Sequence, residues 1–136
     1  MYDSMENIEA VVRKFENCEY SPAEFTHARH LTVAAWYLSR VPMQKALALM
    51  REKLRQFSWH HGKMGYHETI TRFWLQLVET FMAENAGVPL DSMVNKVVQE
   101  FDDKNLLFQY YRRELVMSEK ARAEWVEPDL LPLLHT

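Results

Sequence analysis

The sequence contains little glycine and little proline: three glycines and five prolines among 136 residues. Folds built from many short strands need these residue types at their turns, so their scarcity favours helices. One cysteine, Cys18, excludes an intramolecular disulfide and is compatible with a reducing compartment. A chain of this length is expected to form one domain with its own apolar core.

An excess of basic residues and a long apolar run are also absent. The formal net charge is −3, and the densest basic run, Arg112-Arg113, is followed at once by Glu114. A nucleic-acid-binding domain normally shows a basic stripe, and a membrane-spanning helix needs about 20 consecutive apolar residues. The first six residues also lack the basic and apolar regions of a signal peptide. We therefore expect no nucleic-acid or membrane partner, and a cytoplasmic protein.

Apolar residues recur at three- and four-residue spacing along most of the chain, which predicts an all-α fold. We expect a single helical domain over residues 1–136, with a weaker helical segment at 1–20 and an extended tail at 126–136. Between them the pattern predicts a bundle of about four main helices and two shorter ones. The main helices are expected at 21–39, 42–61, 66–85 and 90–101, and the shorter ones at 106–111 and 118–122.

The clearest local signal is Ser21-Pro22-Ala23-Glu24. Serine at the N-cap, proline at the first helical position and glutamate at the third form a capping box. We therefore expect the first main helix to begin here, with a buried second half.

Histidines are the most informative residues of the chain. His27 and His30 are three residues apart, so they share a helix face, and His67 lies near the start of a later helix. If the two helices are neighbours, these three imidazoles converge and predict a site for a divalent metal ion. Two histidines from one helix and one from another, with an open position, suit a catalytic zinc ion, and a carboxylate added to two of them suits non-haem iron. Glu68 is the candidate general base or ligand-orienting residue.

Other interpretations of the same residues stay open. The histidines could line a metal-free polar pocket or have no functional role, and Glu68 could instead pair with Arg72 four residues along the helix. A zinc-protease motif is excluded because Thr71 stands where its second histidine would be. A di-iron site is disfavoured because the only Glu-x-x-His copy uses Glu24, which the capping box explains.

The remaining histidines and one basic run have milder interpretations. His60 and His61 follow the second main helix, where the helix dipole favours a positive imidazole, although they could also line the same cavity. His135 lies in the tail and is expected to be uninvolved. The run 110–114, Tyr-Tyr-Arg-Arg-Glu, combines donors and cations that could bind an anionic ligand, but such a run is more often a solvated face.

Several segments together resemble a family of short bacterial all-helical proteins whose activity is uncharacterised. They are Phe25-Thr26-His27-x-x-His30-Leu31, Ala35-Trp36-Tyr37-Leu38, Tyr66-His67-Glu68-Thr69-Ile70-Thr71, Tyr110-Tyr111 and the stretch 118–130. The resemblance covers about residues 20–133 and implies a single-domain protein with the histidine segments as its signature. It implies no reaction.

We expect a small metal-binding helical protein, with zinc or iron held by His27, His30 and His67, that acts as a hydrolase or oxygenase on a small molecule. The alternative is a non-catalytic module that binds a small molecule or a partner in the same cavity without metal. A third hypothesis is an assembly protein that forms a homodimer through an apolar helix face.

Overall fold

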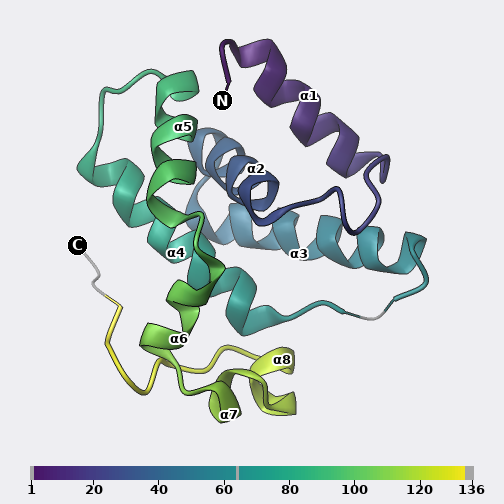
Figure 1. Cartoon of the computed structure of the whole chain (residues 1–136), viewed down its shortest axis with the longest axis vertical. Coiled ribbons are helices and arrows are strands. Elements are labelled where there is room, and N and C mark those ends of the chain that lie inside the picture. Colours follow the sequence, from purple (N-terminus) through teal and green to yellow (C-terminus); the bar gives the residue numbers. More distant parts are fainter. Residues whose placement is uncertain (1, 64, 134–136) are drawn as a thin grey trace.

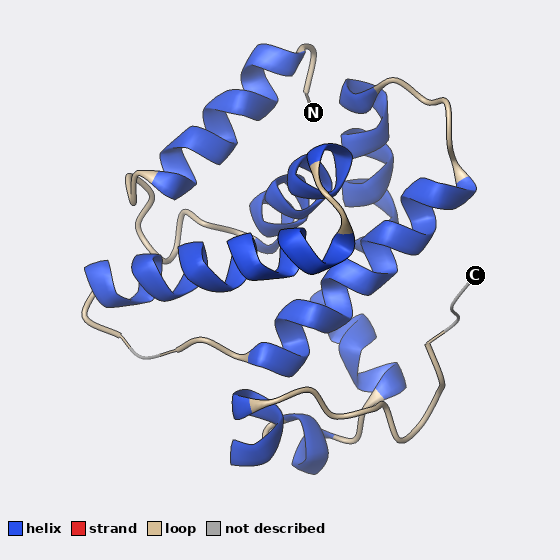
Figure 2. Cartoon of the chain, turned by 180° about the vertical axis from the view of Figure 1, so that it is seen from behind, coloured by secondary structure: helices blue, strands red, loops and turns tan. Residues whose placement is uncertain are grey.

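The computed structural model describes residues 2–63 and 65–133, and all regular secondary structure in this part of the chain is helical (Figures 1 and 2). The all-α prediction is therefore confirmed. Five helices have 12 to 18 residues. They are α1 (Met5–Glu16), α2 (His27–Arg40), α3 (Met43–His60), α4 (Glu68–Glu84) and α5 (Leu90–Phe101).

Helix α2 lies at the centre of the fold, in contact with α1, α3, α4 and α5. Its sequence explains this position. Six of its residues are buried, and the small side chains of Ala34 and Ala35 let neighbouring helices approach closely. The predicted burial of its second half is confirmed, because a helix that is apolar on most sides must be covered on most sides.

The structure differs from a bundle of about four main helices. The first twenty residues, with their weaker pattern, form α1 as a full helix that buries Ile8, Val11, Val12 and Phe15. Ser4 caps this helix by accepting a hydrogen bond from the Asn7 N–H at 3.4 Å. Its exposed face carries many charges, which dilutes the apolar pattern without removing the stripe.

The predicted start of α2 at Ser21 is wrong, although the capping box exists. The Ser21 N–H donates to Glu24 Oε1 at 2.8 Å, and the Glu24 N–H donates to Ser21 Oγ at 3.1 Å. The box closes only one turn, because the chain changes direction to place Phe25 against Phe15, with ring centroids 4.4 Å apart. Thr26 then supplies a second N-cap, and α2 begins at His27.

The boundaries of α5 are those predicted, and the capped turn at 118–122 is also confirmed. Ser118 caps α8 (Glu119–Ala123) through a 3.2 Å hydrogen bond from the Ala121 N–H. Between these elements lie the 3₁₀-helix η1 (Lys104–Leu106), α6 (Leu107–Tyr110) and α7 (Arg113–Val116).

The C-terminal segment, which we define as residues 104–133, lies against α4 below the main helices (Figure 1). Its anchor is Tyr111, which is fully buried and packs edge-on against Phe73 of α4. Residues 124–133 follow without a helix, and the last residues of the expected tail, 134–136, lie outside the described part of the chain. Within the described residues, no helix combines the length and apolar character needed to cross a bilayer.

Candidate functional site

A cleft of about 960 Å³ lies where α2, α3, α4 and the C-terminal segment meet. The three histidines of the predicted metal site all contribute to its wall. The contact between α2 and α4 brings all three to the same cleft, but in the described part of the chain they do not form a group that could hold a metal ion. The lining includes Phe25, Thr26, His27, His30, Met50, Leu54, Phe57, Ser58, Tyr66, His67, Ile70, Thr71, Trp74, Lys104, Asn105, Leu107, Phe108, Arg113 and Met117.

His67 is the N-cap of α4, and both of its ring nitrogens are engaged. Nδ1 accepts a hydrogen bond from the Ile70 N–H at 3.1 Å, and the Nε2–H donates to the Val116 carbonyl at 2.6 Å. The residue is only 8% exposed. One ring thus satisfies a free N–H of the α4 first turn and joins α4 to the end of α7.

These two hydrogen bonds require a neutral ring that carries its proton on Nε2, since a carbonyl oxygen can only accept. Burial, as the largest cause, lowers the pKa of His67 below its usual value of 6.5. To bind a metal ion, His67 would have to give up the helix cap or the bond to Val116.

His27 has one engaged nitrogen and one without a partner in the described part of the chain. Its Nε2–H donates to the carbonyl oxygen of Phe101, the last residue of α5, at 2.9 Å. The ring also packs edge-on against Trp74, with centroids 4.5 Å apart. Burial lowers the pKa of His27, partly offset by the bond to Phe101.

His30 is different, because neither ring nitrogen has a hydrogen-bond partner among the described residues. The ring lies on Phe25, with centroids 4.0 Å apart, and contributes to the cleft wall. Burial, assisted by the neighbouring His27, lowers the pKa of His30 to about 4. At neutral pH this imidazole is uncharged and offers one donor and one acceptor.

Within residues 2–63 and 65–133, no group of three or more histidine, cysteine, aspartate or glutamate side chains is placed to hold a metal ion. The hydrogen bonds of His67 and His27 explain this, since they turn two of the three rings toward carbonyl oxygens. The zinc or iron site is not tested by this arrangement and stays a prediction.

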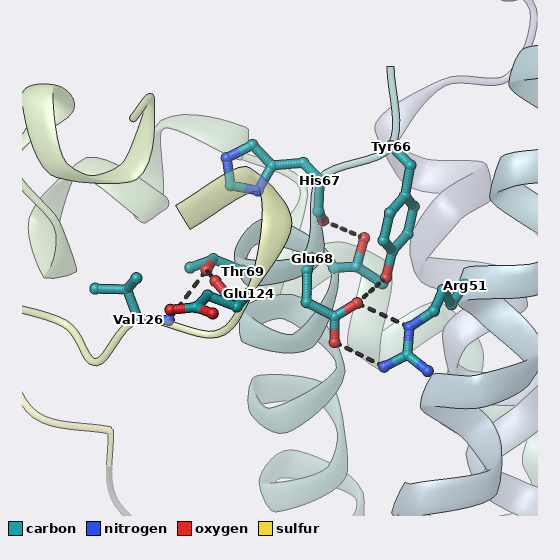
Figure 3. A network of polar contacts seen from close by, with 8 residues as sticks. Arg51, Tyr66, His67, Glu68, Thr69, Glu124 and Val126 are labelled. Atoms are coloured by element: carbon teal, nitrogen blue, oxygen red, sulfur yellow. Dashed lines mark hydrogen bonds and ion pairs between the residues drawn. The ribbon is translucent and has the colours of Figure 1, made fainter. Parts of the chain in front are cut away.

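Glu68 faces away from His67, toward α3 (Figure 3). Arg51 donates to both of its carboxylate oxygens, from Nε at 2.9 Å and from a terminal nitrogen at 2.7 Å, and the Tyr66 hydroxyl donates to Oε1 at 2.6 Å. The hydrogen bonds from Arg51 are the largest cause that lowers the pKa of Glu68. A carboxylate that is so stabilised is a weaker base, and it serves here to join α3 to α4.

The alternative pairing of Glu68 with Arg72 is wrong. The Arg72 guanidinium lies over the ring of Trp125 in the C-terminal segment, 4.4 Å from the ring centre. Residues on opposite sides of the first turn of α4 therefore bond different parts of the fold. Glu68 holds α3, while Thr69 on the other side donates to the Glu124 carbonyl and accepts from the Val126 N–H (Figure 3).

His60 and His61 lie at the C-terminal end of α3, as predicted, and outside the cleft lining. The Nε2–H of His61 donates to the Tyr20 carbonyl at 2.9 Å, which ties this helix end to the loop before α2. His135 lies outside the described residues.

The sequence did not reveal the charge pattern of the cleft. The described lining contains Lys104 and Arg113 but no aspartate or glutamate. Arg113 belongs to the basic run noted in the sequence, whereas Lys104 carries no signal of its own. Only the packing of the C-terminal segment against the main helices brings these two cations to the cleft.

Comparison of this chain with protein-family models, with curated proteins and with solved structures found no match in any of the three.

Proposed function

We propose that this protein binds a small organic molecule in the cleft between α2, α3, α4 and the C-terminal segment. Its volume of about 960 Å³ is of the size of ligand sites, which range from roughly 300 to 1,000 Å³. Its wall is mainly apolar and aromatic, with a few polar groups, which is the usual composition of such sites.

The single observation that carries the proposal is the ring of His30, which is partly buried in the cleft wall and has no hydrogen-bond partner among the described residues. Ligand sites characteristically present a few such polar groups within an apolar wall. His27, His61 and His67 each bond a backbone carbonyl through one ring nitrogen, whereas His30 has no such bond among the described residues. A ligand in the cleft would supply the missing partner of His30.

The proposal is for binding, without an assigned reaction. The only carboxylate that the sequence suggested as a base, Glu68, is held by Arg51 and does not contribute to the cleft wall. The small-molecule module therefore has more support in the geometry than the metal-dependent enzyme.

The test is a thermal-shift screen against small metabolites, with and without a chelator, followed by calorimetric titration of any compound that stabilises the protein. Ser58→Trp adds a large side chain to the cleft wall, and Ala48→Trp adds the same side chain to an exposed position of α3 outside the lining. We expect the first variant to lose binding and the second to keep it. Equal binding by both variants would place the ligand elsewhere and refute the proposal.

The predicted metal site is our second candidate, because His27 and His30 share the cleft wall and retain unpartnered ring nitrogens among the described residues. We would measure the metal content of untagged protein by mass spectrometry, for the wild type and for His30→Leu. One bound zinc or iron per chain that is lost in the variant would support the site. A wild-type protein with far less than one metal per chain after growth in metal-supplemented medium would count against it.

A further inference from the structure

We infer that the ligand of this cleft is an organic anion with an aromatic or bulky apolar body, for example a carboxylate or sulfonate. This inference rests on the proposed binding function and adds the chemical class of the ligand. It follows from the distribution of charge, aromatic surface and unpartnered groups around the cleft.

The first observation is the sign of the charge. Two cationic side chains, Lys104 and Arg113, contribute to the cleft wall, and no acidic residue does so in its described part. The sign differs from that of the whole chain, which has 19 acidic and 16 basic residues and a net charge of −3. Within an acidic surface, such a patch favours the approach of an anion.

The two cations are also not neutralised by ion pairs in the described part of the chain. The ion pairs found there join Arg51 to Glu68, Arg112 to Asp129 and Lys120 to Glu124. Arg113 lies over the ring of Phe108, 4.1 Å from its centre, which fixes its guanidinium beside an aromatic side chain of the cleft wall.

Nearby acids do not reverse this pattern. Asp102 and Asp103 precede Lys104 and act on His27 through their charge, but both are exposed and neither contributes to the lining. The first turns of α2 and α4 also border the cleft, and the positive ends of helix dipoles add to the same field.

The second observation concerns the interior of the cleft. Phe25 and Phe57 lie with ring centroids 5.3 Å apart, the tilted ring of His30 packs against Phe25, and Trp74 lies on the wall near His27. Such a surface accommodates an aromatic or branched apolar body. Lys104 and Arg113 are exposed at the rim, so a ligand with its charge outward and its apolar body inward matches both regions.

The inference can be tested with two fluorescent probes that share one skeleton. 8-Anilinonaphthalene-1-sulfonate carries a sulfonate, and N-phenyl-1-naphthylamine is the same aromatic body without it. We expect the wild-type protein to bind the sulfonate about tenfold more tightly at low salt, since two cations near a surface each contribute a modest attraction. The difference should shrink in 0.5 M NaCl because the ions screen it.

Two sets of charge-removing variants distinguish the effect of the cleft cations on sulfonate binding from the effect of the net charge of the protein. A double variant with Lys104→Gln and Arg113→Gln should lose most of the preference for the sulfonate and keep an unchanged affinity for the neutral probe. The matched pair Lys45→Gln and Lys96→Gln makes the same change in net charge at exposed positions outside the cleft, and it should preserve the preference. Ser58→Trp should weaken the binding of both probes.

The outcomes distinguish this inference from the proposed function. If both probes bind equally well and Ser58→Trp removes both, the cleft binds small molecules but does not select anions, and the inference is wrong. The same holds if the two charge-changing pairs have equal effects on the sulfonate. If neither probe binds, or if Ser58→Trp changes neither affinity, both the inference and the proposed function are wrong.

Discussion

His67 and His30 contribute to the same cleft, yet one ring is bound at both nitrogens and the other has no partner among the described residues. His67 closes the first turn of α4 and reaches the Val116 carbonyl. The ring of His30 packs against Phe25 at a tilt, and neither of its nitrogens has a partner among the described residues. Two histidines that looked equivalent as candidate ligands therefore differ in kind: the first maintains the fold, and the second is available to a ligand.

Among the changes considered, His67→Ala should lower the free energy of unfolding most. The variant leaves the Ile70 N–H without its cap and the buried Val116 carbonyl without its donor, and each loss costs on the order of 1 to 2 kcal/mol. We expect the free energy of unfolding to fall by about 3 kcal/mol in urea denaturation.

Two variants make this comparison sharper. His67→Asn can restore the cap but not the bond to Val116, so it should recover about 1 kcal/mol. Thr26→Ala removes the exposed cap of α2, whose hydroxyl accepts from the Arg29 N–H, and should cost only about 1 kcal/mol. A loss for His67→Ala no larger than that for Thr26→Ala would show that the bond to Val116 contributes nothing.

Acidification from pH 7 to pH 5 should cause the next largest loss of unfolding free energy. His30 has a pKa near 4 in the folded chain and an ordinary value of 6.5, so between these values the unfolded chain binds more protons. This contribution to stability is present above pH 6.5 and is lost as the pH falls, by roughly 2 kcal/mol at pH 5. Lowered pKa values of His27 and His67 act in the same direction.

The measurement is urea denaturation at several pH values down to 5, where most carboxylates are still ionised. His30→Leu should show a flatter dependence on pH than the wild type, because the titrating group is gone. Identical dependence in both proteins would mean that the folded structure does not lower the pKa of His30.

Glu68→Gln should have a smaller effect, about 1 kcal/mol of unfolding free energy. The ion pair with Arg51 is partly shielded, with the Glu68 side chain 13% and the Arg51 side chain 34% exposed, and glutamine keeps part of the hydrogen bonding. Arg51→Gln is the matched control and should cost a similar amount, since it breaks the same pair. Loss of ligand binding without loss of stability would instead assign Glu68 to the site.

His30→Leu should have the smallest effect on stability at pH 7, within about 1 kcal/mol in either direction, because it removes a partly buried ring that has no hydrogen-bond partner among the described residues. Its effect on ligand affinity should be clear, since the polar contact from the cleft wall is lost. A large loss of stability would show that the ring of His30 has a structural partner and would remove the main support for the proposed function.

The elements that could be predicted depend on neighbours along the chain. The stripe of Met93, Val94, Val97, Val98 and Phe101 lies on one face of a single helix, and the predicted boundaries of α5 are those observed. The hydroxyl of Ser118 bonds a backbone group three residues away, and so the short helix α8 was also predictable. Local spacing contains all the information that such elements need.

The predictions that were wrong depend on contacts between distant segments. The capping box at Ser21 forms as expected, but the packing of Phe25 on Phe15 stops the helix after one turn. Glu68 has an acceptable partner four residues away, yet it pairs with Arg51 because α3 and α4 pack against each other. In each case a contact between segments distant in the sequence decided an outcome that local spacing did not contain.

By itself the sequence determined the helical class, most helix boundaries and the placing of His27 and His30 on one face, because these follow from periodicity and capping. Only the tertiary structure decided what each imidazole does. Each neutral ring has one donor and one acceptor, and its role depends on which carbonyl or N–H lies within about 3 Å. Packing placed Val116 and Phe101 beside two of the rings and left His30 facing the cleft.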